Sequence, residues 1–395
     1  MLGSFVAGAK NTIQAWHSLA GLANLSADWS DVIFYAESNA DWAHIGPVVA
    51  VLNEKHGQPV TCITSDPGDT ILSRHHDLVK PFFVGSGIAR TIFFQTTKAQ
   101  AFVMTLTDLD TYYLKRSQNS VHYFYIFHAL VSAHGAYREH AFDAYDTVFC
   151  VGPHHISEIR EQEKTYQLRE KKLVEAGYCR LDLVYSASQD HLKELRKPGA
   201  TEPVVLLAPT WGPSSMVGHC LEKAIDVLID ARIKTILRLH PMTLRHFPQL
   251  PEKLEADYAE TGYFRFDKHL QAIDSLLQAD VMIADHGGSG LEFALGLERP
   301  VVSIATPAKI HNPGRDRIAL PLFEDVIRKN MGSVLDLKDL DKLPDVVLAL
   351  HAQFSEWRSN LAQTRQKNIY NVGKSAEIMA DYIFDFVSSK KGKSS

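Results

Sequence analysis

One stretch of the sequence, residues 280–300, constrains the fold more than any other. An apolar run, Val281–Ala284, leads into Asp285-His286 and the glycine-rich segment Gly287-Gly288-Ser289-Gly290. A helical pattern then begins at Leu291. We interpret this order as a buried strand, a tight glycine turn and the N-terminus of a helix. Such a turn presents backbone N–H groups at the positive end of a helix, and it is therefore suited to bind phosphate.

Glu292 lies one turn into the predicted helix. Its carboxylate can accept hydrogen bonds from two ribose hydroxyls at once. The residues that we expect to contact a nucleotide here are Asp285, Gly287, Gly288, Ser289 and Glu292. An ordinary strand–helix turn with a solvated Glu292 is the alternative, and the segment alone leaves it open.

The rest of the chain alternates short apolar runs with helical stretches on both sides of a charged, polar segment at residues 189–201. This alternation predicts an α/β protein with two doubly wound, Rossmann-like domains, at 31–195 and 201–368, that face a central cleft. The expected strands are 31–35, 60–64, 91–94, 101–105, 122–127, 147–151, 204–208, 235–239, 281–284 and 301–304. We further expect a helical segment at 1–30, a C-terminal helix at 369–388 and a disordered tail at 389–395.

Composition excludes several classes of function. The net charge of −5 over 395 residues gives no reason to expect nucleic acid as a partner. The four cysteines are far apart and form no CxxC pair, and Asp108 and Asp110 are too few carboxylates to predict a divalent site. We therefore expect no metal and no cofactor. No apolar run is long enough to span a bilayer and no signal peptide is evident, which predicts a cytoplasmic protein.

The N-terminal segment is apolar but weakly charged. Leu2, Phe5, Trp16 and Leu22 recur at helical spacing, and Lys10 is the only formal charge before residue 28. This pattern fits a helix that packs on the protein's own surface. It fits equally well a peripheral contact with the inner face of the cell membrane.

Polar residues follow three successive strands of the second predicted domain. They are Thr210 and Trp211 after the first strand, Arg238 and His240 after the second, and Asp285 with Gly288 after the third. Because parallel strands end at the same edge of a sheet, we expect these groups to converge. A guanidinium and an imidazole can pair with the two phosphates of a nucleotide diphosphate. Each pattern alone also fits a capped strand or an ordinary turn with a core tryptophan.

His128 follows a predicted strand of the first domain and is our candidate for a general base that deprotonates an acceptor hydroxyl. The chain has 19 histidines, and His122, His134 and His140 lie in the same region. A structural role for any one of them is the alternative.

Six short motifs together resemble the CDP-glycerol glycerophosphotransferase family, the teichoic-acid-type polyol-phosphate transferases with a GT-B fold. The motifs are FHAL at 127–130, AGYCRLD at 176–182, APTW at 208–211, RLHP at 238–241, ADHGGSGLEFA at 284–294 and YNVGKSAE at 370–377. They occur in the family's order, and the resemblance covers about residues 122–384.

The resemblance implies that His128 is the catalytic base, that His240 lies at the donor phosphates and that Glu292 stands where the family usually has an aspartate that holds donor hydroxyls. The chain departs from the family pattern at Gly287-Gly288, where the family has a hydroxyl pair, and at Cys179, where it has proline. The double glycine followed by a glutamate also resembles the donor site of UDP-sugar 2-epimerases.

The sequence therefore predicts a GT-B-type transferase that moves glycerol phosphate, or another polyol phosphate, from a CDP-activated donor to a hydroxyl of a cell-surface glycan or lipid-linked acceptor. The acceptor would bind to domain 31–195 and the nucleotide to domain 201–368, where Arg238 and His240 stabilise the departing phosphate without a metal. A GT-B sugar-nucleotide glycosyltransferase or 2-epimerase-like enzyme is the first alternative. A catalytically inactive module that binds nucleotide-linked glycans is the second.

Overall fold

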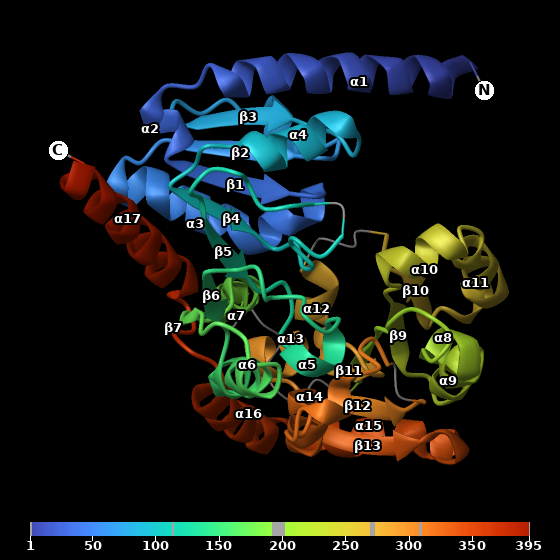
Figure 1. Ribbon diagram of the computed structural model, residues 1–395. Helices are drawn as coiled ribbons and strands as arrows, with labels where there is room; N and C mark the ends of the chain where they lie inside the picture. The colour runs from blue at the N-terminus through green and yellow to red at the C-terminus, as the bar shows by residue number, and fades with distance from the viewer. Residues whose placement is uncertain (1, 113, 192–201, 269–272, 308–309, 395) are drawn as a thin grey trace.

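Two parallel sheets dominate the computed structural model, which describes residues 2–112, 114–191, 202–268, 273–307 and 310–394 (Figure 1). The strands of the first sheet are β1 (Val32–Ala36), β2 (Val60–Thr64), β3 (Val79–Phe83), β4 (Ala101–Met104), β5 (His122–Ile126), β6 (Thr147–Cys150) and β7 (Lys172–Glu175). The strands of the second are β8 (Val204–Leu207), β9 (Lys234–Leu237), β10 (Phe264–Phe266), β11 (Val281–Ala284), β12 (Val301–Ala305) and β13 (Gly332–Asp336).

Helices connect these strands and cover both faces of each sheet. Before the second sheet they are α1 (Leu2–Ala23), α2 (Ala27–Ser30), α3 (Trp42–His56), α4 (Ile88–Thr96), α5 (Ala133–Ala136), α6 (Pro153–Thr165) and α7 (Cys179–His191). From the second sheet onward they are α8 (Met216–His219), α9 (Leu221–Asp230), α10 (Pro241–His246), α11 (Leu250–Tyr258), α12 (Asp274–Gln278), α13 (Gly288–Leu297), α14 (Phe323–Ile327), α15 (Leu343–Ala352), α16 (Phe354–Asn368) and α17 (Ser375–Ser394).

The two sheets share one winding scheme. Their strand orders are β3-β2-β1-β4-β5-β6-β7 and β10-β9-β8-β11-β12-β13, and all neighbouring pairs are parallel. The chain order reverses between β1 and β4 and again between β8 and β11. Ligands of doubly wound proteins bind outside the carboxyl ends of the strands at such a reversal. The predicted α/β, doubly wound architecture is confirmed.

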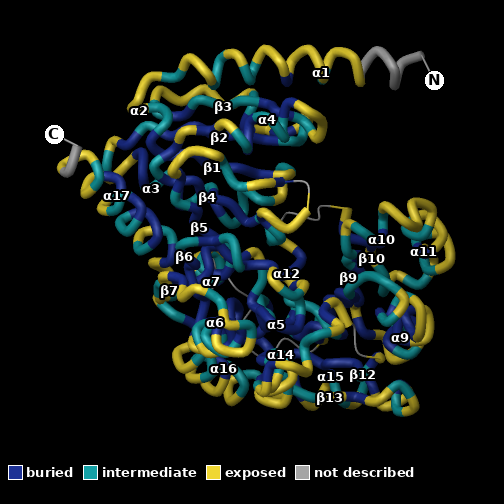
Figure 2. Tube along the Cα trace, in the orientation of Figure 1, coloured by how far each residue is buried: buried dark blue, intermediate teal, exposed yellow. Residues whose placement is uncertain are grey.

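Strand β1 shows why the sequence folds in this way. All five of its residues are buried, and successive side chains enter different cores on the two faces of the sheet. Phe34 packs in the core that includes α3 and α17, whereas Tyr35 packs in the core that includes α4. Figure 2 shows the resulting buried centre of each domain beneath exposed helices. Helix α17 thus returns the end of the chain to the first domain, beside α3 (Figure 1).

Two predictions about local structure are wrong. Residues 91–94, predicted as a strand, lie in helix α4, where Ala89 and Phe93 are buried at helical spacing. A short apolar run cannot by itself distinguish a strand from a buried helix. The tail predicted to be disordered from residue 389 continues helix α17 to Ser394, and Lys391 Nζ lies 2.6 Å from Asp31 Oδ2. The predicted linker at 189–201 falls mostly on residues 192–201, which lie outside the described residues.

Helix α1 lies along the edge of the first sheet, beside β3 and α4 (Figure 1). Ala15 is buried against Phe83 and Ala89, while Ile13 and Trp16 on the same helix are 59% and 46% exposed. The helix therefore has one packed face and one open apolar face. Among the described residues, no helix is both long enough and apolar enough to cross a membrane.

Candidate functional site

The structure brings the predicted strand-end residues of the second domain to the reversal between β8 and β11. The side chains of Trp211 and His240 have ring centroids 6.1 Å apart, and the backbone N–H of Thr210 donates to Asp285 Oδ1 at 2.8 Å. A cavity of about 310 Å³ lies beside them. Among the predicted site residues, those that line it are His128, Thr210, Trp211, Gly287 and Gly288. Residues from both domains thus share one cavity.

The glycine turn forms one wall of this cavity. Gly287 caps helix α13, which begins at Gly288 and also contains the predicted residues Ser289 and Glu292. A Cβ atom at Gly288 would lie 4.0 Å from the Cβ of Ala129 in the opposite domain. A larger side chain at this position would therefore enter the space between the domains, next to His128. The turn leaves the start of α13, with its partial positive charge, open to the cavity.

Asp285 links the start of the glycine turn to the loop that follows β8. Its two carboxylate oxygens accept hydrogen bonds from the backbone N–H groups of Thr210 and Met216, at 2.8 and 2.7 Å. The side chain is buried, and burial raises the pKa of this carboxyl group while the two backbone hydrogen bonds act in the opposite direction. Asp285 therefore fixes the loop that carries Thr210 and Trp211.

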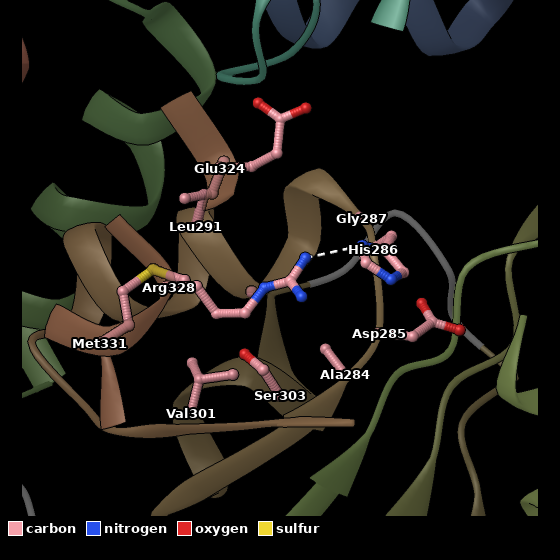
Figure 3. Close-up of a pocket in the computed structure, with 11 residues that line it drawn as sticks. Ala284, Asp285, His286, Gly287, Leu291, Val301, Ser303, Glu324, Arg328 and Met331 are labelled. Carbon is pink, nitrogen blue, oxygen red and sulfur yellow. Dashed lines mark hydrogen bonds between the residues drawn. The ribbon is translucent and has the colours of Figure 1, made fainter. Parts of the chain in front are cut away.

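His286 is held in one orientation behind the turn (Figure 3). Its Nδ1 accepts a hydrogen bond from Arg328 Nη2 at 2.6 Å, and its Nε2 lies 2.7 Å from the carbonyl oxygen of Thr306. The adjoining cavity measures about 10 Å³, which is room for about one water molecule. We infer that the contacts of His286 hold the turn in place. The space beside it is too small for a substrate, so the larger cavity is the candidate substrate site.

Arg238 and His240 follow β9, and neither is among the residues that line the 310 Å³ cavity, although His240 lies close to Trp211, which does. Arg238 Nη1 lies 3.3 Å from Ser275 Oγ and its Nε lies 3.9 Å from Asp267 Oδ2, so the guanidinium is held in place. His240 caps helix α10, because its Nδ1 accepts a hydrogen bond from the backbone N–H of Met242 at 3.1 Å. The proton of the neutral ring is therefore on Nε2.

His128 lies across the cavity from the glycine turn. Its Nδ1 is 3.2 Å from the carbonyl oxygen of Thr105, so Nδ1 carries the proton and Nε2 is the basic nitrogen. Desolvation by the surrounding protein lowers the pKa of His128, although the charge of Asp41 and the bond to Thr105 oppose this shift. The imidazole is therefore neutral at pH 7, which is the form that a general base requires.

The neighbouring histidines have structural contacts instead. Each has a polar partner on its own domain: Thr147 for His122, Glu158 for His134 and Asp143 for His140. None of the three lines the 310 Å³ cavity. Of the four histidines considered from the sequence, His128 is the one at the cavity wall.

Glu292 joins the two domains. Its Oε1 lies 2.9 Å from the hydroxyl of Tyr178, which is also 3.0 Å from the backbone oxygen of His128. Its Oε2 accepts a hydrogen bond from Arg180 Nε at 3.0 Å. The carboxylate thus reaches from the nucleotide side to the backbone of the candidate base, and it retains lone pairs for a ligand hydroxyl.

Tyr178, Arg180 and His44 were missed by our sequence analysis as site residues. The ring of His44 lies 6.3 Å from that of His128 and stacks on Tyr178 at 5.6 Å, and burial lowers the pKa of His44 to about 3. Tyr178 and Arg180 belong to the motif AGYCRLD, which could have drawn attention to them. Asp182 of the same motif accepts the backbone N–H groups of Gly373 and Ser375 and so anchors the start of α17.

The donor set gives no indication of a metal site. Within the described residues, no group of three or more His, Cys, Asp or Glu side chains is arranged to hold a metal ion. The positive charge at the cavity includes Arg315, which lines it, and the start of α13. Arg238 and Arg180 do not line the cavity, but their charges interact with each other and with Glu292.

Comparison with known proteins gives one family. A model of the CDP-glycerol:poly(glycerophosphate) glycerophosphotransferase family matches residues 92–319. No curated protein matches the sequence.

Among solved structures, the wall teichoic acid polymerase TagF is 12% identical, with a TM-score of 0.59 over 98% of this chain and 95% of that chain. A putative UDP-N-acetylglucosamine 2-epimerase from Listeria monocytogenes is 13% identical, with a TM-score of 0.57 over 88% and 94%. The UDP-GlcNAc 2-epimerase of Methanocaldococcus jannaschii is 12% identical, with a TM-score of 0.55 over 90% and 99%. These likenesses show the fold, which is GT-B-like.

Proposed function

Because this chain belongs to the CDP-glycerol:poly(glycerophosphate) glycerophosphotransferase family, we propose that the cavity between its domains carries out the family's reaction with His128 as the base. The enzyme is a transferase that uses CDP-glycerol as donor and a glycan hydroxyl as acceptor. Donor binding belongs to the second domain and acceptor binding to the first. The observation that carries this assignment is the position of His128 across one cavity from Gly287 and Gly288.

In the proposed step, the acceptor oxygen attacks the phosphorus of the glycerol phosphate group. The bond from that phosphorus to the bridging oxygen of CMP breaks, and CMP departs with that oxygen. The proton of the acceptor hydroxyl passes to His128 Nε2, which is free to take it because Nδ1 faces Thr105. Arg238, His240 and the start of α13 stabilise the charge on the phosphates.

In this proposal the remaining predicted residues bind the donor. Thr210 and Trp211 offer a hydroxyl and an aromatic surface at the cavity wall, and Ser289 lies in the first turn of α13. Glu292 holds donor hydroxyls with the lone pairs that Tyr178 and Arg180 leave available. We assign the entry of the acceptor to a second groove, of about 720 Å³, which shares His311 with the cavity and is lined by both domains, with Arg138 from the first and Arg317 from the second.

A donor-consumption assay tests this proposal. The protein is incubated with a panel of CDP-polyols and of UDP-, GDP- and CMP-sugars, and donor loss is measured with and without a glycan acceptor. We expect consumption of CDP-glycerol that depends on the acceptor. Consumption of UDP-sugars alone would favour the glycosyltransferase or 2-epimerase alternative. Tight donor binding without turnover would favour an inactive binding module.

The state of His128 gives a prediction for pH dependence. A general base works only when deprotonated, and burial lowers the pKa of His128 below its ordinary value of 6.5. We therefore expect kcat/KM to decline on the acid side with a midpoint below pH 6.5. The measurement is kcat/KM against pH at saturating donor. A decline whose midpoint lies above 6.5 would contradict the assignment.

We also propose that the open face of α1 touches the inner surface of the cell membrane, where a lipid-linked acceptor would be reached. Ile13 and Trp16 are exposed on this helix, and interfacial binding increases with buried apolar area. The helix offers Lys10 as its only formal charge, so little attraction to anionic lipid is added. The expected association is weak and reversible.

The double variant Ile13→Ser/Trp16→Ser tests this contact without removing the packed face of α1. We expect less sedimentation with liposomes and less activity on a lipid-linked acceptor, with unchanged activity on a short soluble acceptor. Val326→Ser is the control, because Val326 is an equally exposed apolar residue on α14. Equal sedimentation of the double variant and the control would rule out the contact.

A further inference from the structure

Arg180 crosses the domain boundary next to the candidate site. It lies in the first turn of α7 in the first domain, and its Nε donates to Glu292 Oε2 of α13 in the second domain at 3.0 Å. The side chains of Arg180 and Glu292 are 20% and 14% exposed. The charge of Glu292 is the main cause that raises the pKa of Arg180, so the guanidinium is always protonated.

Close helix packing fixes the position of this pair. One turn further along each helix, Val184 of α7 faces Gly296 of α13. A Cβ atom at Gly296 would lie 2.7 Å from Val184 Cγ1, which means that only glycine permits this approach. The backbones of α7 and α13 therefore hold Arg180 and Glu292 in register, unlike an ion pair between two mobile surface side chains.

The terminal nitrogens of Arg180 are left for another ligand. Glu292 occupies Nε, and Nη1 and Nη2 have no hydrogen-bond partner among the residues that the structure describes. A guanidinium donates five hydrogen bonds in a planar fork, and its natural bidentate partners are carboxylates and phosphates.

The guanidinium of Arg238 interacts electrostatically with both Arg180 and Glu292. Burial lowers the pKa of Arg238, Asp267 and Glu292 raise it, and the positive charge of Arg180 lowers it further. Arg180 and Arg238 thus repel each other across the domain boundary. A phosphate between them would relieve that repulsion, whereas a neutral ligand would not.

We propose that Arg180 binds the phosphate group that is transferred, from the side of the first domain, while Arg238 binds the donor from the second. This inference rests on the proposed function, since it takes the donor to be a CDP-activated polyol. Glu292 is then a positioning residue for Arg180 as well as a ligand of donor hydroxyls. The donor phosphates would then contact both Arg180 on α7 and the start of α13. Donor binding would therefore favour the arrangement in which the two domains lie close together.

The test compares Arg180→Ala with Arg358→Ala. Arg358 is a matched control, because its Nε also donates to a glutamate of the α13 region, Glu298, at 3.0 Å, yet it lies at the other end of the helix. We expect Arg180→Ala to lower kcat/KM for CDP-glycerol by about 10²-fold and Arg358→Ala to leave it near the wild-type value. Affinity for cytidine, which has no phosphate, should be unchanged in both.

Added guanidinium chloride should restore part of the activity of Arg180→Ala and none of the activity of Arg358→Ala, because it supplies the missing cation. Arg180→Lys keeps the charge but loses the planar fork, and we expect it to fall between wild type and Arg180→Ala. If Arg180→Ala fails to fold, the comparison of donor and cytidine affinity in Arg180→Lys decides the question.

Two outcomes would overturn the inference. The first is that kcat/KM for CDP-glycerol falls no further in Arg180→Ala than in Arg358→Ala. If Arg180→Ala does not fold, the same comparison is made with Arg180→Lys. The other is an equal loss of affinity for donor and for cytidine. Both require a wild-type protein that turns over CDP-glycerol. An inactive wild-type protein would instead overturn the proposed function, and the inference with it.

Discussion

Replacement of His128 by alanine is expected to lower turnover by about 10²–10⁴-fold and to leave donor binding near normal. The side chain supplies a neutral imidazole at the wall of the cavity. In the proposed mechanism Arg238, His240 and Glu292 act on the donor from the second domain. The variant therefore loses the proton acceptor and keeps the nucleotide site. Steady-state kinetics and donor titration by calorimetry measure the two effects separately.

His140→Ala is the control for this variant. His140 lies in the same region of the first domain, but it is exposed and paired with Asp143 at 2.6 Å. We expect His140→Ala to keep wild-type turnover. If His128→Ala abolished nucleotide binding instead of turnover, the assignment of the two substrates to the two domains would be wrong.

Arg238→Ala is expected to remove roughly 2–4 kcal/mol of transition-state stabilisation, which corresponds to about 30–1000-fold in kcat/KM. The reason is the loss of one oriented, charged donor at the departing phosphate. Because Arg238 is mostly buried beside Asp267, the variant should melt at a somewhat lower temperature than the wild type but remain folded, since no apolar core residue is removed. Kinetics of the purified variant, together with its melting temperature, give the measurement.

The control for Arg238→Ala is Arg265→Ala on the adjacent edge strand β10. Arg265 is exposed and bonds Gln278 at 2.7 Å, so its removal should change neither turnover nor melting much. Wild-type turnover in a soluble, folded Arg238→Ala protein would exclude the clamp role of this residue.

The strands that sequence analysis located are the central ones of both sheets. Strand β1 is buried at every residue, and its continuous apolar run was therefore visible in the sequence. The strands that it missed are β3, β7, β10 and β13, which are the edge strands of the two sheets. Edge strands are partly open to water and carry charge or proline, as in KLVE and VKPFF.

Some features of the candidate site could be predicted from the sequence, and others could not. Convergence at one sheet edge could be predicted, because residues that follow parallel strands meet wherever the strands lie in the sequence. The contacts of Glu292 could not be predicted. Its partners Tyr178 and Arg180 are more than 110 positions away and belong to the other domain. That contact depends on how α7 packs against α13, which no local pattern encodes.

The support role of Asp285 was also beyond the sequence pattern. We expected it to contact the nucleotide, and both of its oxygens accept backbone hydrogen bonds from the loop at 210–216. An aspartate after a buried strand fits either role, and only the path of the following loops distinguishes them.

Transfer of glycerol phosphate from CDP-glycerol releases CMP, so the identity of the released nucleotide distinguishes this reaction from the others. Purified protein is incubated with CDP-glycerol and a short glycan acceptor, and the nucleotide and the acceptor are identified by mass spectrometry. We expect CMP and an acceptor that has gained one glycerol phosphate, in equal amounts, and the loss of both products in His128→Ala. Release of CDP with transfer of glycerol alone, or no change in the acceptor while UDP-sugars are consumed, would contradict it.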